Sequence, residues 1–247
     1  LKRRKLRNWI TIFGIVIGVV AIVSLISLSE GLKSTINEEF NNLGSQRITI
    51  ISKYQGFGGE NSLGLKDEDI KNIEKIADVD YATGSLRGSY DVKYGQKTLA
   101  LTIASYEKDY FEKMLTQENR ELLKGTYISS DKAKEVVVGY DFVNPEKVDD
   151  LFGKVLGIGK KIKVNDEEYT IVGVLKKTGD ARKDSMIYLS NDNLKELSES
   201  ETYAMIFAIN KEGKNIEETS KKIEDMLERK RGSKDVFVTN PVQITKS

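Results

Sequence analysis

Cysteine and histidine are both absent from this 247-residue sequence, and it has only two prolines and one tryptophan. Without cysteine the sequence offers no disulfide, no thiolate nucleophile and no sulfur ligand for zinc or an iron–sulfur cluster. Without histidine it cannot form a Ser-His-Asp triad, a Cys-His dyad or an HExxH metal site. These two absences exclude most common hydrolase designs.

An excess of charge of one sign is also lacking, because 39 Lys and Arg face 38 Asp and Glu, but the charge is unevenly distributed. Five basic residues fall within the first seven positions, and no acidic residue precedes Glu30. Residues 30–247 therefore carry 34 basic side chains (39 minus 5) against 38 acidic ones. A mildly acidic body binds polyanions poorly, so we expect no nucleic-acid partner.

A long uncharged run, residues 9–29, directly follows the basic segment. As a helix it would be about 32 Å long, close to the ~30 Å hydrocarbon core of a bilayer. Basic residues are retained on the cytoplasmic side, so we predict a membrane helix, a cytoplasmic N-terminus and an extracytoplasmic body over residues 30–247. A buried core helix would need no basic flank, and a cleaved signal peptide has a shorter apolar region.

Small residues recur along one side of this predicted helix. Gly14 and Gly18 form a GxxxG pattern, which lets a second helix approach closely in lipid. We predict that they pack against other membrane helices; the alternative is a helix with no partner. Beyond the membrane, Leu32, Ile36 and Phe40 recur at intervals of four and predict an amphipathic stalk that ends near Gly44.

The body after residue 44 carries a strand–helix–strand pattern at each end. The predicted elements are residues 47–52, 67–76 and 80–87 at one end, and residues 202–209, 216–229 and 235–239 at the other. Two such units far apart in the sequence predict a split βαβ, ferredoxin-like α+β fold with a large insertion. The insertion is rich in short predicted strands, among them residues 135–138 and 161–164, with a hairpin turn at residues 165–166. Another hairpin turn is predicted at residues 94–96.

These signals predict four regions along the chain. They are residues 1–43 (basic segment, membrane helix and stalk), 44–103 (first half of the split domain), 104–200 (inserted β-rich subdomain) and 201–247 (second half). No internal repeat of fixed period is present.

Motifs for chemistry are largely missing. The glycine-rich stretch 153–161 departs from GxxxxGK[ST] in spacing and ends in Lys161 instead of Ser or Thr, so it is not a phosphate-binding loop. Three acidic residues, 67–69, open a predicted helix, where the helix dipole explains them without a metal. A Ser/Lys dyad or a carboxylate pair remains possible, but nothing singles one out. We predict no catalytic residue, cofactor or metal site in this chain.

Several motifs, in order along the chain, resemble those of one family. A basic segment leads into Thr11, Gly14, Ile15, Ile17, Gly18 and Val19; later come Ser105–Phe111, Leu151–Gly153, and the run Gly159, Lys160, Ile162, Ile171, Val172, Gly173, Val174 and Leu175. In these features the sequence resembles the permease subunits of MacB/FtsX/LolC-type ABC transporters.

The resemblance implies a porter subdomain with an inserted sabre subdomain. It also implies a dimer of permease copies in the lipid bilayer, a cytoplasmic ATPase partner that carries the ATP and Mg²⁺, and an extracytoplasmic substrate or partner protein. Such proteins convert nucleotide binding below the membrane into movement above it.

The family has three further membrane helices after the core, which this sequence does not contain, so we expect a fragment of a four-helix permease or else a single-pass relative. The competing functions are a membrane-anchored sensor or binding module and an anchored enzyme.

Overall fold

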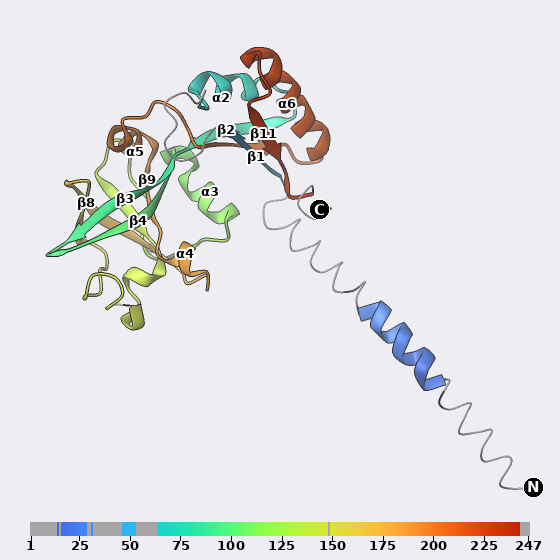
Figure 1. The fold of residues 1–247 in the computed structure, drawn as a ribbon, viewed down its shortest axis with the longest axis horizontal. Coiled ribbons are helices and arrows are strands. Elements are labelled where there is room, and N and C mark those ends of the chain that lie inside the picture. The colour runs from blue at the N-terminus through green and yellow to red at the C-terminus, as the bar shows by residue number, and fades with distance from the viewer. Residues whose placement is uncertain are drawn as a thin grey trace, which may run out of the picture. The chain divides into compact units, whose positions relative to one another are not determined.

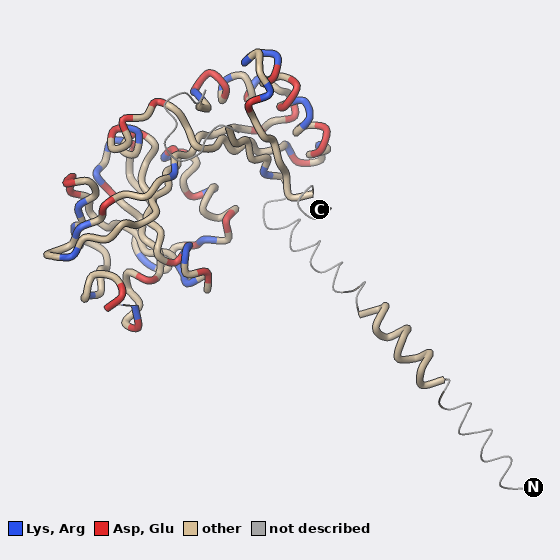
Figure 2. Tube along the Cα trace, in the orientation of Figure 1, with Lys and Arg blue, Asp and Glu red and all other residues tan. Residues whose placement is uncertain are grey.

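The computed structural model describes residues 14, 16–28, 31, 46–52, 64–147 and 149–242. The chain divides into two compact units, Leu1–Leu43 and Gly44–Ser247, which are described separately (Figure 1). In the first unit residues 14 and 16–28 are helical, exposed and uncharged (Figure 2). Across the described ranges, no helix is both long and apolar enough to cross a membrane. The predicted stalk residues Leu32, Ile36 and Phe40 lie outside these ranges.

The second unit contains two β-sheets, the smaller of which is built from both ends of the chain. Its elements are β1 (Arg47–Ser52), α2 (Asp67–Glu74), β2 (Val79–Ser85), β10 (Met205–Asn210), α6 (Ile216–Arg231) and β11 (Val236–Thr239). The strand order is β11-β1-β10-β2, and all neighbours are antiparallel. Two interleaved βαβ units produce this order. We call this sheet with α2 and α6 the small lobe.

Local sequence explains why the small-lobe elements form where they do. In β1 buried residues alternate with partly buried ones, so that Ile48 and Ile50 both enter the core. Helix α6 begins after Asn215, whose side chain accepts hydrogen bonds from the backbone of the first turn. It ends at Gly232, whose φ of 69° suits glycine. Ile223 of α6 is fully buried.

The larger sheet holds the remaining strands. They are β3 (Arg87–Tyr94), β4 (Lys97–Tyr106), β5 (Leu122–Gly125), β6 (Glu135–Val138), β7 (Lys161–Val164), β8 (Glu167–Leu175) and β9 (Ile187–Ser190), accompanied by α3 (Phe111–Gln117), α4 (Ala181–Asp184), α5 (Asn191–Ser198) and the short 3₁₀ helices η1 (Lys108–Tyr110), η2 (Tyr140–Phe142) and η3 (Pro145–Lys147). The order is β5-β8-β6-β9-β4-β3-β7, and β7 also pairs with β8. Six strands thus form a closed ring, with β5 alongside β8 as an extension. We call this assembly the large lobe.

Both faces of the central strands in the large lobe are buried. Val136 and Val138 of β6 belong to one apolar cluster, whereas Val137 between them faces a second cluster with Tyr188 and α3. A strand buried on both faces reads as an unbroken apolar run. For this reason the apolar run at residues 135–138 predicted β6 with the bounds that the structure shows.

The boundary of the insertion differs from the prediction. The hairpin formed by β3 and β4 was predicted to belong to the first half of the split domain, residues 44–103. Instead, β4 pairs with β9 and β3 with β7, so both strands belong to the larger sheet. The insertion therefore begins directly after β2. A hairpin has the same local pattern in either sheet, and only its long-range partners decide where it lies.

Candidate functional site at the junction of the two lobes

The chain passes between the lobes twice, after β2 and before β10. At the first passage, a buried chain of hydrogen bonds ties the end of β2 to β4 and α5 of the large lobe. The backbone N–H of Leu86 donates to Ser105 Oγ at 3.1 Å. Ser105 Oγ in turn donates to Asn191 Oδ1 at 2.7 Å, and Asn191 Nδ2 donates to the carbonyl oxygen of Gly84 at 2.9 Å. All four residues are buried, so breaking one link would leave polar groups without partners.

Tyr203, just before β10, connects this junction to α2. Its ring lies against Gly84, where an added Cβ would be only 2.4 Å from ring carbons. Its hydroxyl donates to Asp67 Oδ1 at 2.7 Å. Lys195 of α5 lies 4.3 Å from the Tyr203 ring centroid and 3.4 Å from Asp67 Oδ1. The hydrogen bond from Tyr203, and then the charge of Lys195, lower the pKa of Asp67 despite its partial burial.

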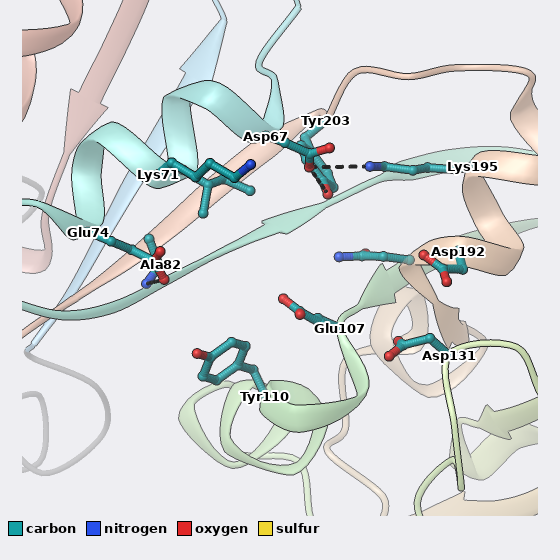
Figure 3. A pocket seen from close by; sticks show the side chains of 12 residues that line it. Asp67, Lys71, Glu74, Ala82, Glu107, Tyr110, Asp131, Asp192, Lys195 and Tyr203 are labelled. Carbon is teal, nitrogen blue, oxygen red and sulfur yellow. Dashed lines mark hydrogen bonds and ion pairs between the residues drawn. The ribbon is translucent and has the colours of Figure 1, made fainter.

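A cleft of about 500 Å³ opens between the lobes beside these contacts (Figure 3). Acidic side chains from both lobes line it. The five carboxylates are Asp67 and Glu74 from the small lobe and Glu107, Asp131 and Asp192 from the large lobe, and the two lysines are Lys71 and Lys195. The lining therefore carries an excess of negative charge.

Glu107 lies among these carboxylates (Figure 3). Its pKa is raised, chiefly by burial and then by the negative charges of Asp131, Asp109, Glu74 and Asp192. A like charge nearby disfavours the charged form of a carboxyl. The described residues nevertheless contain no group of three or more acidic side chains placed to hold a metal ion.

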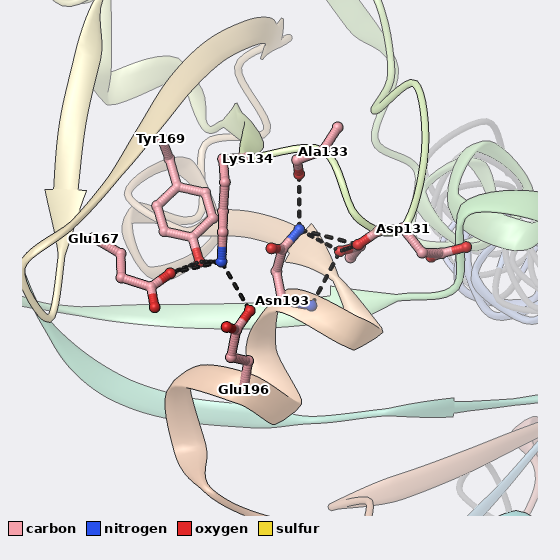
Figure 4. A network of polar contacts seen from close by, with 8 residues as sticks. Asp131, Ala133, Lys134, Glu167, Tyr169, Asn193 and Glu196 are labelled. Carbon is pink, nitrogen blue, oxygen red and sulfur yellow. Dashed lines mark hydrogen bonds and ion pairs between the residues drawn. The ribbon is translucent and has the colours of Figure 1, made fainter.

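A polar network in the large lobe holds the wall of the cleft that carries Asp131 (Figure 4). Asn193 of α5, which is buried, donates from Nδ2 to the backbone oxygen of Asp131 at 3.1 Å. Lys134 forms ion pairs with Glu167 of β8 at 2.7 Å and with Glu196 of α5 at 2.9 Å. The segment around Asp131 is thereby tied to α5 and to the sheet.

A second set of contacts joins the lobes through α3. The rings of Tyr81 in β2 and Tyr110 in η1 stack at 4.4 Å with an interplanar angle of 3°. Nη1 of Arg47, the first residue of β1, lies 3.6 Å from Oε1 of Glu118, which directly follows α3. The lobes are thus packed together here, whereas an open, acidic space separates them at the cleft.

Among the residues singled out by sequence analysis, the cleft brings together Asp67 of the acidic triplet and Glu107 and Tyr110 of the Ser105–Phe111 motif. Gly14 and Gly18 are helical, and no described atom lies within 4 Å of a Cβ built on either, so their role in packing stays a prediction. In the acidic triplet 67–69, Asp69 accepts from the backbone N–H of Lys66 and pairs with Arg231. These contacts give Asp69 a structural role.

Sequence reasoning missed most of the junction. Asp131, Asp192 and Tyr203 are far apart in the sequence and follow no motif spacing, and Glu107 was noted only as part of the Ser105–Phe111 motif, without a role. Such residues come together only through the pairing of distant strands. Together they form a charged cleft beside the two chain segments that connect the lobes. Such an arrangement is compatible with a domain that binds a partner or changes shape.

Comparisons with known proteins show the family of the chain. Residues 9–226 match the family described as the MacB-like periplasmic core domain, and the chain belongs to this family. An uncharacterized ABC transporter permease of Methanocaldococcus jannaschii is 29% identical over 248 residues, which cover 100% of this chain and 61% of that protein. The macrolide export ATP-binding/permease protein MacB of Campylobacter fetus is 26% identical, covering 97% of this chain and 37% of that protein. The chain therefore spans about 37–61% of the length of these relatives.

Solved structures show the same fold. The periplasmic region of MacB from Actinobacillus actinomycetemcomitans matches with a TM-score of 0.67 at 18% identity, covering 86% of this chain and 96% of that one. The extracellular domain of the ABC-type transporter YknZ from Gram-positive bacteria matches with a TM-score of 0.61 at 17% identity, covering 78% of this chain and all of that one. The α+β fold of the core is therefore shared with extracytoplasmic domains.

Proposed function

We propose that this chain is the extracytoplasmic core and first membrane helix of an ABC transporter permease. In this role it transmits the ATP-driven movement of a cytoplasmic ATPase to the outer side of the membrane, where a substrate is exported or a partner protein is activated. The observation that carries the proposal is the family match over residues 9–226, which includes the whole of the predicted membrane helix, residues 9–29. In this proposal the small lobe corresponds to the porter subdomain and the large lobe to the sabre subdomain.

The geometry of the small sheet supports this role. β1 and β11 are antiparallel neighbours in which Thr49 pairs with Thr239, so the chain enters β1 and leaves β11 at the same end of the sheet. A domain inserted between two membrane segments needs both of its ends on the side facing the bilayer. In the proposed permease, movement of the membrane segments would therefore act on two adjacent strands of one sheet.

The proposed orientation can be tested directly because the sequence contains no cysteine. Glu212 lies in an exposed turn of the small lobe, and Lys2 in the basic N-terminal segment. We expect Glu212→Cys to react with a membrane-impermeant maleimide on intact cells, and Lys2→Cys to react only after permeabilisation. The cysteine-free parent is the control for background labelling. Protection of position 212 together with labelling of position 2 would reverse the proposed topology.

The proposed ATPase partner calls for a separate experiment. We expect affinity purification of the membrane-embedded permease to recover an ATPase with a Walker motif, since this sequence contains no GxxxxGK[ST] phosphate-binding loop. Detergent-solubilised complexes would be identified by mass spectrometry, with an unrelated single-pass membrane protein as control. Recovery of the permease without any ATPase, under conditions that preserve its oligomer, would contradict the coupling role and favour a sensor or binding module.

A further inference from the structure

We propose that the cleft between the lobes is an electrostatic hinge, in which the Lys195–Asp67 contact holds the lobes together and the facing carboxylates hold them apart. This inference goes beyond the proposed transport role and does not depend on it. It follows from three features of the junction: two covalent connections, one ion pair across the cleft, and an excess of like charge on both walls.

The covalent connections allow a hinge at this point. The large lobe is an insertion between β2 and β10, so only two strands of chain join it to the small lobe. Both pass beside Gly84, against which the Tyr203 ring packs. A change in backbone torsion at these two neighbouring segments would rotate one lobe against the other. This rotation would also have to shift the contacts of Tyr81 with Tyr110 and of Arg47 with Glu118.

The holding contact lies at the cleft. Lys195 belongs to α5 of the large lobe and Asp67 to α2 of the small lobe, and their charged atoms are 3.4 Å apart. Lys195 also lies over the ring of Tyr203, which donates its hydroxyl hydrogen to the same Asp67 oxygen. One lysine thus makes two favourable contacts that exist only while the lobes are close.

The opposing force comes from carboxylates whose charge is not neutralised by an ion pair. Asp131 and Glu74 accept hydrogen bonds only from backbone N–H groups, of Lys108 and Ala82 respectively. Glu107 faces both walls. The charged and titratable groups that line the cleft with it are Asp67, Lys71 and Glu74 of α2, Tyr110 of η1, Asp192 and Lys195 of α5, and also Asp131 and Tyr203. The charge of Asp109 in η1 also acts on it. Bringing the lobes closer concentrates this negative charge, which opposes closure.

The sign of the pH dependence follows from the raised pKa of Glu107. The close arrangement binds the Glu107 proton more tightly than an open one, where the carboxyl would approach its ordinary pKa of 4.5. The close arrangement is therefore favoured at low pH and loses that advantage as pH rises above about 4.5, through the raised pKa.

A distance measurement between the lobes tests the hinge. The full chain in lipid nanodiscs would carry nitroxide labels at Lys221→Cys on α6 and Lys160→Cys before β7, two exposed positions outside the cleft. At pH 7 we expect Glu107→Gln with Asp192→Asn to shift the distance distribution away from its parent value. Lys195→Gln is expected to shift it in the opposite direction. Lowering the pH stepwise toward 4.5 should move the parent toward the distribution of the carboxylate variant.

A matched control is Glu212→Gln, which removes one exposed negative charge of the small lobe away from the cleft and should leave the distribution unchanged. Circular dichroism would establish that each variant keeps its fold. Identical distributions in the parent, the carboxylate variant and Lys195→Gln would overturn the proposal, and so would shifts of both variants in the same direction. Neither result would bear on the ATPase-coupled role, which the purification experiment tests.

Discussion

Replacing Arg231 by alanine is expected to destabilise the protein by about 3 to 5 kcal/mol, because it leaves two buried carboxylates without their cation. Arg231, at the C-terminal end of α6, pairs with Asp69 of α2 at 2.7 Å and with Asp235 before β11 at 2.6 Å. The side chains of all three are at most 9% exposed. Chemical denaturation of the parent and of Arg231→Ala would measure the difference in the free energy of unfolding.

The matched control for this prediction is Arg229→Ala on the same helix. Arg229 is exposed, and its side chain donates only to the backbone oxygen of Asp225 in the same helix. We therefore expect Arg229→Ala to change the free energy of unfolding by no more than about 0.5 kcal/mol.

The pH dependence of folding stability gives a second check on the role of Arg231. Arg231 lowers the pKa of Asp235, so this pair stabilises the fold above the ordinary carboxyl pKa of 3.8 and ceases to do so as pH falls through the lowered value. An equal loss of folding stability in Arg231→Ala and Arg229→Ala would rule out the proposed role of the two buried ion pairs of Arg231.

Gly84→Ala is expected to disrupt the junction between the lobes. A methyl group at this position would lie 2.4 Å from carbons of the Tyr203 ring, so either the ring or the β2 backbone must move. Overpacking of this kind costs about 1 to 3 kcal/mol. Moving the ring would also weaken its hydrogen bond to Asp67. We expect a lower unfolding midpoint, together with faster amide exchange at residues 84–86.

Two further variants separate the contact with Tyr203 from the general effect of replacing glycine. Gly157 has no atom within 4 Å of a built Cβ, and its φ is not positive, so Gly157→Ala should be neutral or slightly stabilising. Tyr203→Ala should remove most of the penalty of Gly84→Ala, so the two substitutions together should cost less than the sum of their separate costs. Strict additivity would show that the ring is not what the new methyl group meets.

Local signals were sufficient for many elements of the fold. β1, β6 and β7 lie on the residues where apolar or β-branched runs predicted them. The turn at Asn165 and Asp166 was predictable because these residue types tolerate positive φ, and both adopt it, at 45° and 71°. Periodicity likewise placed α6 to within two residues of its end.

Elements without a strong local signal were missed. β5 has only two apolar residues, and its pairing with β8 is interrupted by a bulge at Leu123. α4 is a single turn of polar sequence whose N-cap, Asp180, accepts a hydrogen bond from Arg182. Short elements of this kind are stabilised by tertiary context, which one sequence does not reveal.

The junction was beyond the reach of sequence analysis for a different reason. Asp67 attracted attention only as part of an acidic helix start, which the helix dipole explains. Its role depends on Lys195 and Tyr203, which are more than 100 positions further along the chain. Of the residues that line the cleft, none shows a local pattern that would distinguish it from an ordinary surface charge.

The pairing of β1 with the last two strands also determines when the domain can be completed during synthesis. Thr49 contacts Phe207 of β10 and Thr239 of β11, so the first strand emerges from the ribosome long before either neighbour exists. The pairings of the closed ring lie within residues 87–190, which lets that part form first. Biogenesis must therefore keep an unpaired apolar strand from aggregating until nearly the whole chain has emerged.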